Sequence, residues 1–150
     1  MTKNLTIKIK SINDDIVIPS YETSSSAGLD LRAYLPDGSI KLNPKETKLL
    51  GTGLHFEIPE GFEVQIRPRS GLALKNGVSV LNSPGTIDAD YRGEIKILLI
   101  NHGSESFIVE NEMRVAQMVV ARYERIKFEV VKNLSDSKRG SGGFGSTGTD

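Results

Sequence analysis

Alternation of apolar and polar residues is the feature of this sequence that most limits its fold. Every second residue is apolar in the runs 5–9, 29–33, 54–58, 62–66 and 126–130. A period of two residues is that of a β-strand with one buried face, whereas a helix repeats every 3.6 residues. Turn-forming sequences such as Pro36-Asp37-Gly38 and Asn76-Gly77 separate these runs. The pattern therefore predicts an all-β sandwich, jelly roll or small barrel.

One segment departs from this alternation. Residues 70–75 contain good helix formers between Ser70, a suitable N-cap, and Asn76-Gly77, so we expect one short helix there. The segments 95–100 and 115–121 are more continuously apolar, which is typical of strands that are buried on both faces. We therefore expect these two segments to be central strands.

Composition excludes several classes of function. The 150 residues include no cysteine, which rules out disulfides, Cys-ligated zinc, iron–sulfur clusters and a cysteine nucleophile. The 19 Lys and Arg residues balance the 19 Asp and Glu residues, which argues against a protein that coats duplex DNA, since such binding needs surplus positive charge. His55 and His102 lie in no zinc-binding motif. We expect no nucleic-acid partner.

No segment predicts a membrane span or a secretion signal. The apolar run 97–100 is too short to cross a bilayer. Residues 1–20 alternate in character and lack the unbroken apolar stretch of a signal peptide. We expect a cytoplasmic protein with no membrane partner.

The segment 139–148 near the C-terminus is rich in glycine and has one aromatic residue, Phe144. It has too little apolar surface to offset the entropy of ordering its backbone, so we divide the chain into one domain, 1–138, and a flexible arm, 139–150. One interpretation is a solvated terminus. The other is an arm that closes on a nucleotide. Arg139 and the glycine N–H groups would then face the phosphates, and Phe144 would stack on the base, an interaction worth about 1–3 kcal/mol.

Two internal segments carry groups suited to a phosphate substrate. In 67–72, a helix start beside Arg69 favours a bound phosphate, although exposed arginines at an ordinary helix start fit the sequence equally well. In 85–94, the two carboxylates of Asp88 and Asp90 would share a face of an extended segment. Either carboxylate could activate a water or hold a hydrated metal ion, or both could only solvate a turn.

Three other polar side chains have simpler interpretations. Gln117 lies in an otherwise apolar strand, so its amide either satisfies another backbone group or faces a ligand. His55 is interpreted as a surface residue of its strand and His102 as a turn residue. Neither histidine is predicted to act as a catalytic base.

Five segments, taken together and in order, resemble the five sequence motifs of the homotrimeric dUTPase family. These segments are 27–33, 67–72, 85–93, 114–118 and 139–148. One such segment would be weak evidence, but five in the same order are specific. The resemblance extends from about residue 20 to the C-terminus.

The resemblance implies a fold, an assembly and a reaction. The fold would be all-β, a jelly-roll-like distorted β-barrel with one short helix, assembled as a homotrimer whose active sites are each built from three subunits. The reaction would be the Mg²⁺-dependent hydrolysis of dUTP to dUMP and pyrophosphate, which limits uracil incorporation into DNA and supplies dUMP for thymidylate synthesis. Such displacements at phosphorus depend mostly on positioning and charge neutralisation, so a chain without a dense carboxylate cluster is suited to them.

The resemblance also implies roles for individual residues. Asp88 matches the carboxylate that orients and deprotonates the water attacking the α-phosphorus. Tyr91 matches the aromatic residue that packs beneath the deoxyribose and excludes a 2′-hydroxyl, and Asp30 matches a residue that contacts the metal through water. The remaining matched positions are substrate contacts: Asn82, Thr86 and Ile87 at the uracil edge, Lys96 in the same hairpin, Arg69, Ser70, Gly71 and Gln117 at the phosphates, and Arg139, Phe144 and Gly145 in the arm.

One departure and two alternative functions accompany this resemblance. The family often has a turn glycine where this chain has Glu112, which concerns the local turn. A dCTP deaminase, or a bifunctional deaminase and dUTPase, shares the fold but uses a glutamate base beside the pyrimidine, where this chain has Asp88. A non-catalytic trimer that senses a nucleotide would be free to lose both Asp88 and the arm, and both are present.

Overall fold

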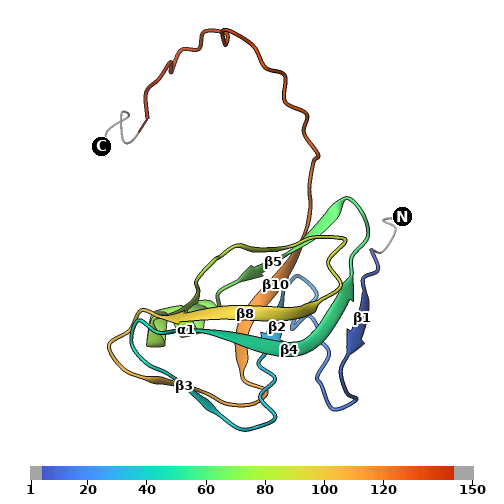
Figure 1. Cartoon of the computed structure of the whole chain (residues 1–150), viewed down its shortest axis with the longest axis vertical. Coiled ribbons are helices and arrows are strands. Elements are labelled where there is room, and N and C mark those ends of the chain that lie inside the picture. The colour runs from blue at the N-terminus through green and yellow to red at the C-terminus, as the bar shows by residue number, and fades with distance from the viewer. Residues whose placement is uncertain (1–4, 144–150) are drawn as a thin grey trace.

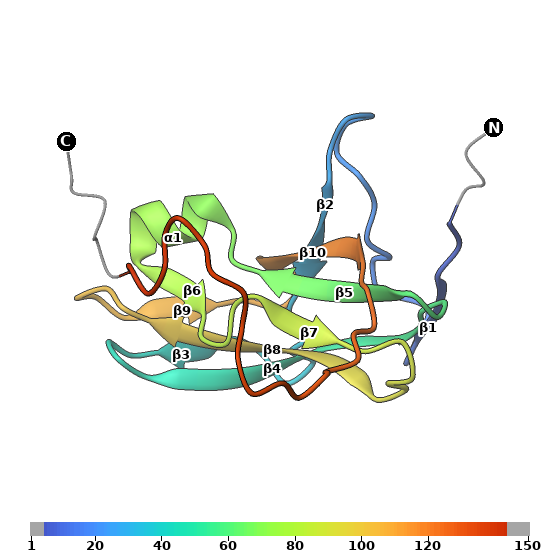
Figure 2. The ribbon, with the colours of Figure 1, turned by 90° about the horizontal axis from the view of Figure 1, so that it is seen from above.

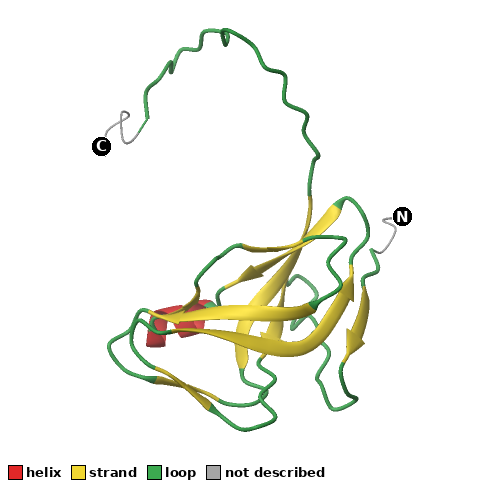
Figure 3. Ribbon diagram, viewed as in Figure 1, coloured by secondary structure: helices red, strands yellow, loops and turns green. Residues whose placement is uncertain are grey.

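The computed structural model describes residues 5–143, in which ten β-strands and one short α-helix form (Figures 1 and 3). The strands are β1 (Lys8–Ser11), β2 (Gly28–Arg32), β3 (Ile40–Leu42), β4 (Thr47–Glu57), β5 (Phe62–Arg67), β6 (Val78–Val80), β7 (Gly85–Ile87), β8 (Glu94–Asn101), β9 (Phe107–Val109) and β10 (Arg114–Arg122), and the helix is α1 (Ser70–Asn76). Four of the five alternating runs overlap β1, β2, β4 and β5. The all-β prediction with one short helix is confirmed.

The strands form two main sheets that face each other. One sheet has the order β1-β4-β8-β6 and the other has the order β2-β10-β5-β7, while β3 and β9 form a small third sheet. Figure 2 shows β5 and β10 on one side of the molecule and β4 and β8 on the other. The neighbouring strands in the two main sheets are antiparallel. This is the layered arrangement of a flattened jelly-roll-like barrel.

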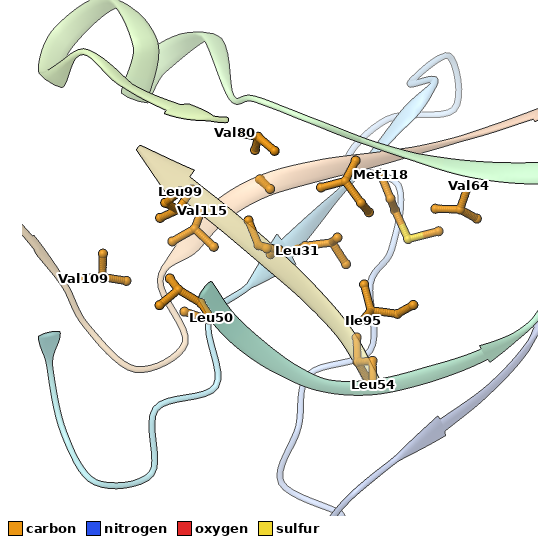
Figure 4. Close-up of a cluster of buried hydrophobic side chains, with 14 of the residues drawn as sticks. Leu31, Leu50, Leu54, Val64, Val80, Ile95, Leu99, Val109, Val115 and Met118 are labelled. Atoms are coloured by element: carbon orange, nitrogen blue, oxygen red, sulfur yellow. The ribbon is translucent and has the colours of Figure 1, made fainter. Parts of the chain in front are cut away.

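The core lies between the two sheets and is made by the inward-facing half of each alternating pattern (Figure 4). In β8, Ile95, Ile97 and Leu99 are fully buried. Leu98, which lies between two of them, and Ile100, which follows, face outward and are only half-buried. Both β8 and β10 are central strands, as predicted, but the expected burial on both faces is wrong for the chain by itself. Its own elements cover only one face of these sheets.

Helix α1 begins one residue earlier than its sequence suggests. Arg69, and not the expected Ser70, is the N-cap residue, and no side chain caps the helix start. The helix ends at Gly77, whose φ of 66° lies in the left-handed region and whose N–H donates to the Ala73 carbonyl at 3.1 Å. Glycine adopts this conformation without steric cost, which explains the Asn-Gly signal at this end.

The turn before β10 forms although it lacks the usual glycine. Glu112 takes a left-handed φ of 62°, and its N–H donates to the Ala33 carbonyl at 2.8 Å. The neighbouring Asn111 side chain accepts the Leu35 N–H at 2.7 Å. These bonds to the β2 side of the molecule hold the turn in the conformation that glycine would adopt most easily.

After β10 the chain extends away from the two sheets (Figure 1). The predicted strand at 126–130 is wrong, since no strand is found at residues 123–143. Ile126, Phe128 and Val130 are 72%, 84% and 97% exposed. A strand needs a hydrogen-bonded neighbour, and within residues 5–143 this segment has none. Among residues 5–143, no helix is long and apolar enough to span a membrane.

The buried side chain of Asn101 forms hydrogen bonds to three backbone groups, so a substitution at this residue tests the fold. Its amide nitrogen donates to the carbonyls of Leu42 at 3.0 Å and Glu105 at 2.8 Å, and its oxygen accepts the Gly103 N–H at 2.8 Å. Asn101→Leu leaves these groups unpaired, so we expect the free energy of unfolding to fall by about 3 kcal/mol or more. Urea denaturation measures this change, and Asn76→Leu at an exposed position is the control. Equal stability of the two variants would contradict the assignment.

Candidate active site

The first candidate cluster surrounds Asp88 at the end of β7. A cavity of about 190 Å³ is lined by Thr86, Ile87, Asp88, Tyr91, Glu94 and Lys96. Five of these residues were predicted from the sequence, and Glu94 was not. The connection from β7 to β8 brings them together, because all six lie within the eleven residues 86–96. The expected hairpin is wrong here, since β7 pairs with β5 in one main sheet and β8 pairs with β4 and β6 in the other.

The ring of Tyr91 is fixed from two sides. Its hydroxyl donates to the Glu94 carbonyl at 3.0 Å. A side chain at Gly93 would place its Cβ 2.3 Å from the same hydroxyl, so only glycine allows the ring to lie there. The Tyr91 N–H donates to the Asp88 carbonyl at 3.2 Å. This bond closes a turn through Ala89 and Asp90, so Asp88 and Asp90 do not share the face of an extended strand as expected.

Glu94, the first residue of β8, links this connection to the neighbouring strand β4. Its carboxylate accepts the Gly53 N–H at 2.9 Å and lies 3.8 Å from the Lys96 ammonium. The pairing of β4 with β8 shifts register between Gly51 and His55, which is a β-bulge. The two glycines in the strand-like sequence Gly51-Thr52-Gly53 are the signal that could have predicted the bulge.

The second cluster surrounds Asp30 in β2. Arg69 donates to the Asp30 carboxylate through Nε at 2.9 Å and through Nη2 at 3.4 Å. Arg114 donates to the same carboxylate at 3.2 Å and also lies 3.0 Å from Glu22. The guanidinium of Arg69 therefore has a fixed orientation. Arg114 and Glu22 were not among the predicted site residues, because their pairing joins segments far apart in the sequence.

Gln117 lies beside this cluster and satisfies a backbone group, which is the first of its two predicted alternatives. Its amide nitrogen donates to the Pro68 carbonyl at 2.9 Å. A Cβ on Gly28 would lie 2.3 Å from the Gln117 side-chain oxygen, so glycine makes room for the amide. The bond ties β10 to the segment that leads into α1, where Ser70 and Gly71 are exposed in the first turn.

The two clusters lie at opposite ends of β5. Ile87 pairs with Val64 near the start of β5. Arg69 follows the end of β5 by two residues. Figure 2 shows α1 at one end of β5 and the turn after β7 at the other. About six residues of extended chain, roughly 20 Å, therefore separate Asp88 from Arg69 within one chain. This distance is more than the two side chains can bridge.

The remaining predicted residues lie outside both clusters. Asn82 is in the loop between β6 and β7. Arg139 is in the extended C-terminal segment, where its Nε donates to the Gly142 carbonyl at 2.7 Å. Phe144 and Gly145 lie outside the described residues. Among residues 5–143, no group of three His, Cys, Asp or Glu side chains is arranged to hold a metal ion.

Known protein families and curated relatives identify the family of this chain. The family model described as dUTPase matches residues 14–148. The chain belongs to the dUTPase family. It is 57% identical over 142 residues to a deoxyuridine 5′-triphosphate nucleotidohydrolase from Nautilia profundicola, a match that covers 95% of this chain and 98% of the relative. A relative of the same name from Helicobacter hepaticus is 55% identical over 148 residues, which cover 99% of this chain and 92% of the relative.

Solved structures confirm the fold of this family member. A G164S variant of the dUTPase from Staphylococcus bacteriophage 80alpha, solved with dUpNHpp, superposes with a TM-score of 0.85 at 24% identity. The superposition covers 95% of this chain and 98% of the phage chain. The jelly-roll-like fold is thus shared at low sequence identity, which is expected when the pattern of buried positions, and not the individual residues, specifies the sheets.

Proposed function

We propose that this chain hydrolyses dUTP to dUMP and pyrophosphate, with Asp88 activating the water that attacks the α-phosphorus. The observation that carries this proposal is the 57% identity to a curated deoxyuridine 5′-triphosphate nucleotidohydrolase over nearly the whole chain. The Asp88 cavity supports it, because a carboxylate and an oriented tyrosine lie together in a space of about 190 Å³. A positioned carboxylate base contributes typically 10²- to 10⁴-fold to rate.

The Asp88 cavity would hold the nucleoside. The ring of Tyr91, fixed by its hydroxyl bond to Glu94, would pack beneath the deoxyribose and leave no room for a 2′-hydroxyl. Thr86 and Ile87 in β7, with Asn82 in the preceding loop, would present hydrogen-bonding groups to the uracil edge. Lys96 lies at the same cavity and would add a positive charge on the substrate side.

The Asp30 cluster would hold the phosphates. Arg69 uses three of its five N–H donors on Asp30 and the Arg114 carbonyl, so two donors remain for a phosphate. Ser70, Gly71 and Gln117 lie beside it. Asp30 then has the role of orienting the guanidinium, which reduces the entropy that Arg69 loses when the substrate binds.

The residues of this cluster fit a magnesium ion that arrives with the substrate. Mg²⁺ retains several waters and is usually bound by one or two carboxylates together with substrate phosphates. The Asp30 carboxylate is partly exposed beside the arginines and would contact such an ion through water. When bound, the ion would neutralise charge on the phosphates.

We further propose that the active site is shared among three copies of the chain. The Asp88 and Asp30 clusters lie at opposite ends of β5, so one chain cannot place both on the same triphosphate. Leu49 of β4, Leu98 of β8 and Leu81, the residue that follows β6, lie side by side, and Leu49 is 60% exposed. This apolar row and the exposed stripe at residues 126, 128 and 130 are suited to contact other copies.

Mixing two inactive variants tests the shared site. We expect Asp88→Asn and Arg69→Ala each to have very low activity, and their denatured and refolded mixture to be several-fold more active than either alone. Mixed trimers would contain sites with an intact Asp88 from one copy and an intact Arg69 from another. Each variant refolded alone is the control. A mixture no more active than the two variants separately would show that both residues act within one chain.

The substrate is tested by pyrophosphate release from dUTP, dTTP, dCTP and UTP in the presence of Mg²⁺. We expect rapid release from dUTP and little from the other three nucleotides. Ammonia release from dCTP would instead indicate a deaminase, and tight dUTP binding without any pyrophosphate would indicate a nucleotide sensor. Equal cleavage of dUTP and UTP would overturn the role of Tyr91.

A further inference from the structure

His55 makes a hydrogen bond to the loop that carries Asp88 and Tyr91. Its Nδ1 lies 3.0 Å from the backbone carbonyl oxygen of Arg92. A carbonyl oxygen only accepts hydrogen bonds, so the proton of this bond must be on Nδ1 of the histidine. The His55 imidazole in β4 is therefore a hydrogen-bond donor, and it restrains the Arg92 carbonyl in the backbone of residues 88–93.

Restraint of the Arg92 carbonyl affects the whole 88–93 loop, because the Arg92 side chain forms hydrogen bonds to other residues of the loop. Its guanidinium Nη1 donates to the carbonyls of Ala89 at 2.7 Å and Tyr91 at 3.0 Å. The Tyr91 N–H in turn donates to the Asp88 carbonyl. Within residues 5–143, the His55 bond is the one side-chain hydrogen bond that links residues 88–93 to a strand other than β8. Holding the Arg92 carbonyl thus restrains the whole loop.

The β-bulge in β4 determines which face of the sheet carries the His55 side chain. Gly53 takes a left-handed φ of 67°, and the Thr52 hydroxyl donates to the Ile95 carbonyl at 2.7 Å. After the bulge, His55 pairs with Glu94 at the end of the loop. A change of one residue in register would turn the imidazole to the opposite face of the sheet, away from Arg92. The hydrogen bond from His55 to Arg92 therefore depends on the register that the bulge sets.

We propose that His55 is a positioning residue for the reaction: it holds the 88–93 loop so that Asp88 and Tyr91 keep their places at the substrate. The proposal rests on the proposed dUTP hydrolysis. It predicts two effects when the donor is lost. Asp88 is less well placed against the attacking water, which lowers kcat, and Tyr91 is less rigid beneath the sugar, which weakens the rejection of UTP. Binding through the phosphates at Arg69 is unaffected, so KM changes little.

Three variants separate this role from a general effect on folding. His55→Phe keeps an aromatic ring and removes the donor, while His55→Asn places an amide N–H at nearly the position of Nδ1. His102→Phe makes the same change at the exposed histidine of a turn beside Gly77. Loss of one neutral hydrogen bond corresponds to roughly 3- to 10-fold in rate. We expect that loss in kcat for His55→Phe, with KM within about twofold, recovery in His55→Asn, and no change in His102→Phe.

Two further measurements are made on the same proteins. The ratio of kcat/KM for dUTP to that for UTP is expected to fall in His55→Phe alone. Hydrogen exchange of the peptide that covers residues 88–94 is expected to be faster in that variant, at unchanged exchange of β5. If His55→Phe does not fold, His55→Ala replaces it, because a truncated side chain introduces no clash.

The possible failures are distinguishable. A wild-type chain that leaves dUTP intact would overturn the proposed function. Faster hydrogen exchange at residues 88–94 in His55→Phe than in the wild type would still support the restraint by His55. A wild-type chain that is active, together with a His55→Phe variant of unchanged kcat, selectivity and exchange, would overturn the inference about His55 alone. A loss of activity that His55→Asn does not recover would also contradict a donor role.

Discussion

The Asp88→Asn variant is expected to lose about 10²- to 10⁴-fold in kcat while it keeps its affinity for the nucleotide. Asparagine has the shape of aspartate but cannot accept the proton of the attacking water. Asp88 follows β7 directly, and its carbonyl accepts the Tyr91 N–H, so the backbone of the loop does not depend on the side-chain charge. The loop and the Tyr91 ring should therefore keep their positions, and the loss should fall on the chemical step.

Single-turnover kinetics with dUTP and titration calorimetry with a non-hydrolysable dUTP analogue measure the two quantities separately. Glu60→Gln is a matched control, because Glu60 and Asp88 both line a larger neighbouring cavity of about 570 Å³, and Glu60 is absent from the 190 Å³ cavity. The control should retain wild-type kcat. A rate for Asp88→Asn within a few-fold of wild type would show that another group activates the water.

Truncation before Arg139 should give a folded protein with kcat/KM for dUTP reduced by about 10²-fold or more. The lost contributions are a stacking contact of Phe144 with the base and a charge-assisted bond from Arg139, worth about 1–3 kcal/mol each. The fold should survive, because the core cluster is formed by residues 31–118 and the Arg139 side chain bonds only to Gly142 within the described residues.

Thermal unfolding, sedimentation and steady-state kinetics of the truncated protein check this expectation, and removal of residues 149–150 alone is the control. A peptide of residues 139–150 added in trans should not restore activity at micromolar concentration, because the tether provides the high effective concentration of the arm. Full activity of the truncated protein would refute the role of the arm in catalysis.

The sequence predicts local structure well where one side chain or one period decides it. The alternation at 29–33 and 62–66 predicts β2 and β5, and the Asn-Gly pair at residues 76–77 predicts the end of α1. The residues of the Asp88 cavity are close in sequence, so one short connection between β7 and β8 is sufficient to bring them together. The predicted N-cap at Ser70 is wrong by one residue, since Arg69 takes that position without any side-chain bond.

The predicted strand at 126–130 fails for a different reason. The alternation at Ile126, Phe128 and Val130 indicates that one face of the segment is apolar. A strand also needs a hydrogen-bonded neighbour, which this local pattern does not supply. Within residues 5–143 the chain offers no such neighbour. The same argument applies to the outer face of β8, where Leu98 and Ile100 remain half-buried. Both observations are consistent with surfaces that are completed by other copies of the chain.

By itself, the sequence determined the β-strand periodicity, the single short helix, the family and the identity of the residues around Asp88, because each of these depends on residue types at short or fixed spacing. Only the tertiary structure decided which distant groups meet. The bond from His55 to Arg92, the support of Gly53 by Glu94 and the pairing of Asp30 with two arginines join separate strands. These contacts depend on strand order and on a register shift between β4 and β8. The glycines at 51 and 53 indicate that β4 is irregular there, but the register itself is set by the packing of both sheets together.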